Sequence, residues 1–146
     1  MPATQGPRLA LWNRERAPVT LVHMSQTVLI VDDHDTYRAF VKSLLQEGGF
    51  EVVGEAANAL SGLDAIRSLQ PDLVVLDVQL PSSSGFEMAR QLRSEGFSAP
   101  IILMSSREAA SYGDQIDNSG AVGFIPKGEM SGETVRAVLE APRNQA

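Results

Sequence analysis

A short apolar run that ends in an aspartate constrains this chain more than any other feature. Residues 73–76 read Leu-Val-Val-Leu and lead directly into Asp77, with Pro81 and Gly85 in the turn that follows. An unbroken run of this length, bounded by turn-forming residues, is typical of a strand buried on both faces of a parallel sheet. Asp77 is then expected at the carboxyl end of the strand. Because ligands of open α/β sheets bind outside these ends, Asp77 is a candidate reactive group.

Four further runs of this kind alternate with segments whose apolar residues recur at helical spacing. The predicted strands cover residues 28–31, 51–54, 73–76, 101–104 and 122–125, with the second expected near an edge of the sheet. A strand followed by a helix, repeated five times with connections of ordinary length, predicts one α/β domain on a parallel sheet. The segment 107–118 is a poor helix because it has few large apolar residues. Other helices are marked by Phe40, Val41, Leu44 and Leu45, by Leu60, Leu63, Ile66 and Leu69, by Phe86, Ala89 and Leu92, and by Val135, Val138 and Leu139. We expect Thr36 or Asp35 to cap the first helix.

Length and composition narrow the class of protein. A chain of 146 residues that is 43% hydrophobic can bury one core. It has no cysteine and no apolar run of the ~20 residues that a membrane span needs. The net charge of −6 disfavours nucleic-acid binding by bulk electrostatics.

The two ends of the chain lack the pattern of a folded element. We interpret residues 1–24 as a flexible tail, in which Met24 is a candidate start of the native protein and a short interaction arm is the alternative. The domain is predicted to cover residues 25–141, and residues 142–146 are a C-terminal tail.

Polar residues end four of the five predicted strands. They are Asp32 and Asp33, Asp77, Ser105 and Lys127, and parallel strands would bring them to one edge of the sheet. Three carboxylates in one place repel, so a cation must neutralise them, and Mg²⁺ suits oxygen ligands. Nothing indicates a zinc site, because the chain has no cysteine or histidine cluster.

Such a site suits phosphoryl transfer, which needs positioning and charge neutralisation above all. Asp77 would be the nucleophile, while Mg²⁺, Lys127 and the Ser105 hydroxyl each contact one phosphoryl oxygen. A response of Ser105 to the new dianion would make a switch.

These residues, in this order and spacing, resemble the receiver domain of bacterial two-component response regulators. Pro81 and Gly85 also match the family pattern, as does Phe124, an aromatic residue three positions before Lys127. The opening sequence Val-Asp-Asp-His-Asp resembles receivers that usually precede a helix-turn-helix DNA-binding domain.

The resemblance implies a flavodoxin-like (βα)5 fold, a doubly wound parallel sheet with strand order 2-1-3-4-5. It implies that a histidine kinase or phosphotransfer protein phosphorylates Asp77 in the cytoplasm. Direct Mg²⁺ ligands would be Asp33, Asp77 and the backbone carbonyl of Gln79, with Asp32 acting through water. Ser105 and Phe124 would then switch a face that binds an unknown downstream protein. We expect a monomer or weak homodimer, with no binding to membranes or directly to nucleic acid.

Two departures from the family pattern stand out. Many receivers have a proline directly after the lysine, whereas here Pro126 precedes Lys127 and Gly128 follows it. We expect no effector domain after Ala146, and therefore output through a partner or by phosphate shuttling. His34 adjoins the acidic pair and is interpreted as a surface residue.

Two other functions stay open. A degenerate receiver would act as a phosphorylation-independent scaffold, and an aspartyl phosphatase would use the same nucleophile and Mg²⁺. Such phosphatases carry a second aspartate two residues after the nucleophile, where this chain has Gln79. We therefore expect a signalling phosphoacceptor rather than an enzyme.

Overall fold

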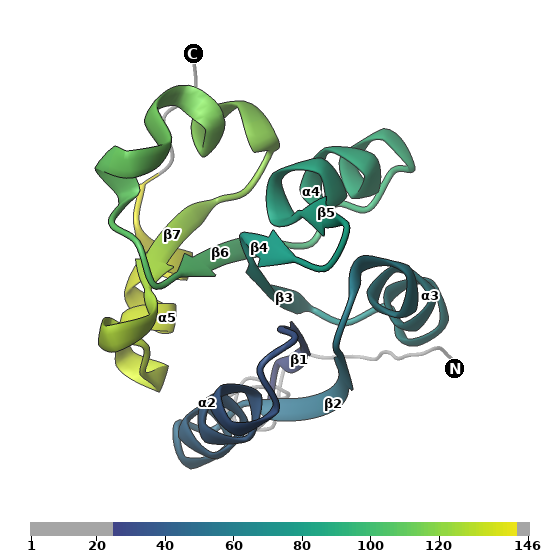
Figure 1. Ribbon diagram of the computed structural model, residues 1–146. Coiled ribbons are helices and arrows are strands. Elements are labelled where there is room, and N and C mark those ends of the chain that lie inside the picture. Colours follow the sequence, from purple (N-terminus) through teal and green to yellow (C-terminus); the bar gives the residue numbers. More distant parts are fainter. Residues whose placement is uncertain (1–24, 143–146) are drawn as a thin grey trace.

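Five parallel strands form the centre of the protein in a computed structural model that describes residues 25–142 (Figure 1). Their order across the sheet is β2-β1-β3-β6-β7. The strands are β1 (Thr27–Val31), β2 (Glu51–Ala56), β3 (Leu73–Asp77), β6 (Ile101–Ser105) and β7 (Gly123–Pro126). Because β6 and β7 are the fourth and fifth strands of this sheet along the chain, the order is 2-1-3-4-5. The flavodoxin-like prediction is confirmed, as is the edge position of β2.

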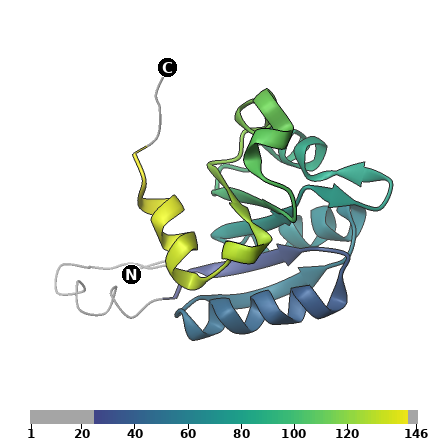
Figure 2. The ribbon, with the colours of Figure 1, turned by 60° about the vertical axis from the view of Figure 1, so that its left-hand side comes forward.

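Four α-helices within residues 25–142 cover both faces of the sheet (Figures 1 and 2). Helices α2 (Asp35–Glu47) and α5 (Gly132–Glu140) pack on one face, and α3 (Ala59–Leu69) and α4 (Gly85–Ser94) pack on the other. The central strands read as continuous apolar runs because successive side chains point to opposite faces and both faces are buried. In β1, for example, Leu29 and Val31 face α3 and α4, whereas Val28 and Ile30 face α2 and α5.

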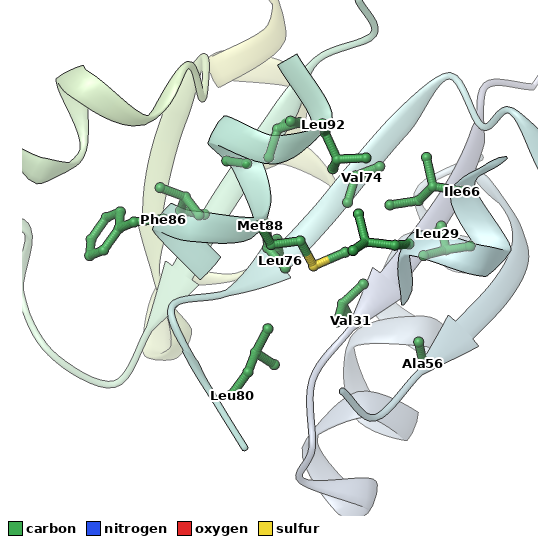
Figure 3. Close-up of a cluster of buried hydrophobic side chains, with 14 of the residues drawn as sticks. Leu29, Val31, Ala56, Ile66, Val74, Leu76, Leu80, Phe86, Met88 and Leu92 are labelled. Carbon is green, nitrogen blue, oxygen red and sulfur yellow. The ribbon is translucent and has the colours of Figure 1, made fainter. Parts of the chain in front are cut away.

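The larger of the two cores lies under α3 and α4 (Figure 3). Met88 of α4 and Ile66 of α3 meet Leu29, Val74 and Leu76 of the sheet there, and all five side chains are at most 1% exposed. This packing holds β1 and β3 rigidly, so the residues at their carboxyl ends are firmly placed.

Some residues that we predicted on the buried faces of the helices are exposed. Leu60 is 72% exposed, because α3 faces the sheet with Gly62, Leu63 and Ile66 instead, and Leu69, at the end of α3, is 46% exposed. At about 100° of rotation per residue, Leu60 lies about 120° away from the middle of that face. The small size of Gly62 permits this orientation, since a Cβ there would lie 2.8 Å from the Met88 methyl carbon.

Two expectations for the first helix are wrong. Phe40 is 53% exposed and contacts the ring of Tyr37, while Val41 and Leu45 carry the buried face of α2. The residue at the N-cap of α2 is His34, and its side chain makes no capping hydrogen bond. Neither Thr36 nor Asp35 therefore caps this helix, because the helix already includes both positions.

The segment after β6 forms no α-helix, as its composition predicted. It folds instead into two short 3-10 helices, η1 (Ala109–Gln115), which is kinked at Gly113, and η2 (Asp117–Ser119). Tyr112 and Ile116 are the residues of this segment that pack against the core under α3 and α4.

A two-stranded hairpin that we did not predict connects β3 to α4. It pairs β4 (Gln79–Leu80) with β5 (Ser83–Ser84) in antiparallel orientation. The N–H group of Gly85 then donates a 2.7 Å hydrogen bond to the carbonyl oxygen of Val78. This close return of the backbone holds the chain directly after Asp77 in place.

The predicted tails lie largely outside the described residues. The prediction for residues 1–24, including Met24, concerns residues outside this range, as does the prediction for residues 143–146. Helix α5 ends at Glu140, close to the expected domain boundary. Within residues 25–142, no helix is long and apolar enough to cross a bilayer.

The replacement Gly85→Ala should destabilise the protein. An added Cβ would collide with the carbonyl oxygen of Asp77 and lie 3.0 Å from the Cα of Val78, so the backbone would have to shift. We expect the free energy of unfolding to fall by about 1–3 kcal/mol, the usual cost of overpacking, in urea denaturation.

Gly128→Ala is the matched control for this variant, because a Cβ at that exposed position meets nothing within 4 Å. Its unfolding free energy should stay within about 0.5 kcal/mol of the wild type. Equal stability of the two variants would contradict the close approach at Gly85.

Candidate functional site

The predicted polar residues meet at the carboxyl edge of the sheet. Asp32 directly follows β1, Asp77 ends β3, Ser105 ends β6, and Lys127 directly follows β7. The register explains their meeting, since Asp77 pairs with Met104, the neighbour of Ser105, and Ser105 pairs with Pro126, the neighbour of Lys127. Four strands thus deliver these side chains to one place.

Lys127 bridges two buried carboxylates. Its ammonium nitrogen lies 2.8 Å from Oδ2 of Asp32 and 3.0 Å from Oδ2 of Asp77. The Lys127 side chain is only 13% exposed, and burial alone would lower its pKa. The contacts with Asp32 and Asp77 outweigh burial and raise the pKa of Lys127 above its ordinary value. Lys127 is therefore a fixed positive charge at this edge, although Pro126 precedes it.

The two carboxylates remain costly to bury. Asp32 is fully buried and Asp77 is 2% exposed. Burial raises the pKa of Asp77 above its ordinary value, even though Lys127 acts to lower it, and the charge of Asp32 adds to the rise. Oδ2 of Asp32, despite its nearness to Lys127, makes no well-aligned hydrogen bond. The single positive charge of Lys127 therefore offsets only part of the negative charge of Asp32 and Asp77.

The residues next to Asp32 extend the acidic cluster. Ligand atoms of Asp32, Asp33, His34 and Asp77 all lie within 4.8 Å of one another. Asp33 is about one-third exposed, so the cluster opens to solvent on this side. Several carboxylate oxygens at short range, only one ammonium group to offset them and an open side fit a hard divalent cation that keeps some of its waters.

Gln79 lies where the chain leaves this edge. Its backbone N–H donates a 3.2 Å hydrogen bond to Oδ1 of Asp77, and its side chain is exposed. The backbone of Gln79 is therefore beside the carboxylate, while the amide side chain points to solvent.

Ser105 is engaged with a residue that sequence reasoning did not select. Its hydroxyl oxygen lies 2.6 Å from the hydroxyl oxygen of Tyr112 and accepts a 3.0 Å hydrogen bond from the N–H of Arg107. Tyr112 belongs to η1 and packs against the core under α3 and α4. A tyrosine in an otherwise weak helical segment was the only sequence signal for it.

Phe124 belongs to a row of three aromatic rings. Its ring centroid is 5.9 Å from that of Tyr112, which in turn packs edge-on against Phe86 of α4 at 5.2 Å. Phe124 is partly buried against the core under α3 and α4. Tyr112 therefore contacts both residues that we predicted to switch, Ser105 and Phe124.

Tyr37 is a second residue that the sequence did not reveal. Its hydroxyl donates a 2.8 Å hydrogen bond to the backbone oxygen of Lys127, and its ring centroid lies 4.7 Å from the ammonium nitrogen. Burial, followed by the charges of Asp32 and Asp77, raises the pKa of Tyr37 to about 12. Tyr37 holds the lysine loop from the side of α2.

Comparison with known proteins agrees with this geometry. Residues 28–139 match the family model of the response regulator receiver domain. The chain belongs to this family, and it is therefore the receiver domain of a two-component signalling protein.

Its relatives include transcription regulators. The chain is 37% identical over 114 residues to the virulence factors putative positive transcription regulator BvgA of Bordetella pertussis, covering 78% of this chain and 54% of the relative. It is 31% identical over 116 residues to the DNA-binding transcriptional activator EvgA of Escherichia coli K12, covering 80% and 56%. The chain thus spans about half the length of these relatives.

Solved structures show the same fold. The signal receiver domain of the putative response regulator NarL from Mycobacterium tuberculosis matches with a TM-score of 0.71 and 27% identity, covering 80% of this chain and 98% of that one. A putative response regulator from Chloroflexus aurantiacus matches with a TM-score of 0.72 and 26% identity, covering 81% and 100%.

Removing the charge of Asp77 should stabilise the protein. Because the folded-state pKa of Asp77 is raised, the ionised carboxylate costs stability at neutral pH, and protonation removes this cost as the pH falls through that pKa. We expect Asp77→Asn, without added metal, to raise the unfolding free energy by on the order of 1 kcal/mol near neutral pH. The gain should shrink in acid, as measured by urea denaturation across pH.

Asp114→Asn serves as the control, since Asp114 is exposed on η1. It should change stability little at any pH. A destabilised Asp77→Asn at neutral pH would contradict the unfavourable burial of this charge.

Proposed function

We propose that this protein is a phosphorylation-dependent switch that accepts a phosphoryl group on Asp77. The observation that carries the proposal is the Lys127 ammonium, which lies within 3.0 Å of both Asp32 and Asp77 at the open end of the sheet. A phosphoryl group in transfer carries negative charge that is spread over its oxygens. A positive charge beside the reacting carboxylate stabilises that charge. Membership of the receiver family supports the same role.

The acidic cluster is proposed to hold Mg²⁺. Asp33, Asp77 and the backbone carbonyl of Gln79 would bind the ion directly, with Asp32 acting through water. The bound ion would supply charge neutralisation to the carboxylates and the phosphoryl oxygens. The short separations within the cluster, and the burial of two carboxylates beside a single ammonium group, support this assignment.

The transfer itself uses groups of this chain in defined roles. A carboxylate oxygen of Asp77 attacks the phosphorus of a phosphohistidine on a histidine kinase or phosphotransfer protein. The new O–P bond forms as the N–P bond breaks, and the histidine nitrogen leaves with the electron pair. Lys127 stabilises the phosphoryl oxygens throughout. The product is an acyl phosphate on Asp77, so the protein is a phosphoacceptor rather than an enzyme with a separate substrate.

The switch is proposed to run through Ser105, Tyr112 and Phe124. To hydrogen-bond a phosphoryl oxygen on Asp77, the Ser105 hydroxyl must reorganise its 2.6 Å contact with Tyr112. Because the Tyr112 ring packs between Phe86 and Phe124, a shift of Tyr112 disturbs the surface around η1 and β7. That surface is the proposed face for the unknown downstream partner.

The wider setting is inferred from the family and stays a proposal. We propose a cytoplasmic protein that is a monomer or weak homodimer. Two of the relatives are named as transcription regulators, and one of them as a DNA-binding activator. The net negative charge of this chain disfavours direct binding of this chain to nucleic acid. The proposed boundary of the receiver remains residues 25–141.

The other two candidate functions have less support. An aspartyl phosphatase needs a general acid near the nucleophile, and the exposed amide of Gln79 cannot serve as one. A scaffold that ignores phosphate would not need two carboxylates buried at the cost described above.

Intact mass spectrometry after incubation with Mg²⁺ and acetyl phosphate tests the proposed function. The wild type should gain one phosphoryl group, and the gain should vanish when EDTA replaces Mg²⁺. Asp77→Ala should gain none, whereas the control Asp114→Ala should behave like the wild type. Absence of an adduct on folded wild-type protein would favour the scaffold, and sustained release of phosphate from unrelated phosphate esters would favour the phosphatase.

A further inference from the structure

The side chain of His34 lies over the acidic cluster, where Nδ1 is within hydrogen-bond distance of Oδ1 of Asp32. His34 is the N-cap residue of α2, but its side chain makes no capping hydrogen bond, and its backbone N–H already bonds Oδ1 of Asp32 at 2.7 Å. The side chain is 64% exposed, so burial does not fix it either. The imidazole nevertheless lies over the acidic cluster instead of extending into solvent.

The imidazole nitrogen Nδ1 is close to three carboxylates at once. It lies 3.1 Å from Oδ1 of Asp32, 3.2 Å from Oδ1 of Asp33 and 3.9 Å from Oδ2 of Asp77. Neighbouring ligands of one cation with bonds of about 2.1 Å are separated by about 3.0 Å, and opposite ligands by about 4.2 Å. The separations of Nδ1 from the oxygens of Asp33 and Asp77 fall within this range, so Nδ1 is spaced from each of them like a fellow ligand of one ion.

The buried end of the cluster carries more negative charge than its one ammonium group offsets. Oδ2 of Asp32 is inaccessible to solvent and makes no well-aligned hydrogen bond. A buried carboxylate oxygen in this state is unfavourable unless a positive charge compensates it. Lys127 compensates only in part, because it is shared with Asp77.

We infer that His34 is a nitrogen ligand of the cation site and shifts its preference from Mg²⁺ towards divalent transition metals such as Mn²⁺, Co²⁺ or Ni²⁺. The inference rests on the proposed cation site and adds His34 to its ligands. Carboxylate and carbonyl oxygens suit Mg²⁺, whereas imidazole favours the later transition metals. With His34 as a ligand, the site can take a transition metal in place of Mg²⁺ while Asp77 and Lys127 keep their places.

A simpler explanation makes a different prediction. His34 could act only as a hydrogen-bond donor or cation to Asp32 and Asp33, competing with any metal for these oxygens. Removal of the ring would then strengthen the binding of every divalent cation. A ligand role instead predicts weaker binding, and most of all for the metal that prefers nitrogen.

Isothermal titration calorimetry of the full chain with Mg²⁺ and with Ni²⁺ separates the two explanations. The measurements are made at mildly alkaline pH on wild type, His34→Ala and His34→Phe, the last of which keeps a planar ring without nitrogen. Affinity for Ni²⁺ should fall by about tenfold or more in both variants, since residues that merely orient a ligand already change metal affinity by about 10- to 100-fold. Affinity for Mg²⁺ should fall far less, so the Ni²⁺ to Mg²⁺ preference collapses.

His23→Gln is the matched control, because His23 is the only other histidine of the chain. It should keep the wild-type preference for Ni²⁺, and loss of the preference in this variant would overturn the role of His34. Equal changes for both metals, or tighter binding of both, in the His34 variants would overturn it too. In either case Mg²⁺ binding by the wild type would leave the proposed function intact. Wild-type protein that binds neither metal would contradict both proposals.

Discussion

The contact of Lys127 with Asp32 and Asp77 is the interaction on which the rest of the site depends. Two almost fully buried carboxylates at one sheet edge repel each other, and a single ammonium group within 3.0 Å of both makes their burial tolerable. The rigid packing of β1 and β3 holds the two carboxylates in place although their burial is unfavourable. The charge that remains uncompensated is the physical reason to expect a cation at this edge and a response when Asp77 acquires a dianion.

The strands and their polar ends could be predicted because each one is encoded locally. A fully buried strand needs an unbroken apolar run, and the first polar residue after it falls at the sheet edge, as Asp77 and Lys127 do. Parallel pairing then brings the ends together, and the receiver resemblance supplies the strand order. The poor helix after β6 was also predictable, since its segment lacks the apolar residues that would hold a helix against the sheet.

What could not be predicted depends on contacts between distant segments. Leu60 has the right spacing for a buried helix face, but the approach of Gly62 to Met88 decides which way α3 turns. The positions of Tyr112 and Tyr37 follow from how η1 and α2 pack around the edge, which no local pattern encodes. His34 is exposed as expected, yet the direction of its ring towards three carboxylates is a rotamer that a sequence does not specify.

The most direct test of the role of Lys127 and its two carboxylates is a crystal structure of the protein with Mg²⁺ and beryllofluoride, which mimics a phosphoryl group on a carboxylate. We expect beryllium bonded to a carboxylate oxygen of Asp77 and a fluoride within hydrogen-bond distance of Lys127. We also expect a cation against Asp33 and Asp77, and Ser105 released from its short contact with Tyr112. Beryllofluoride that is absent from Asp77, or bound there with Lys127 turned away, would contradict the central role of the lysine and its two carboxylates.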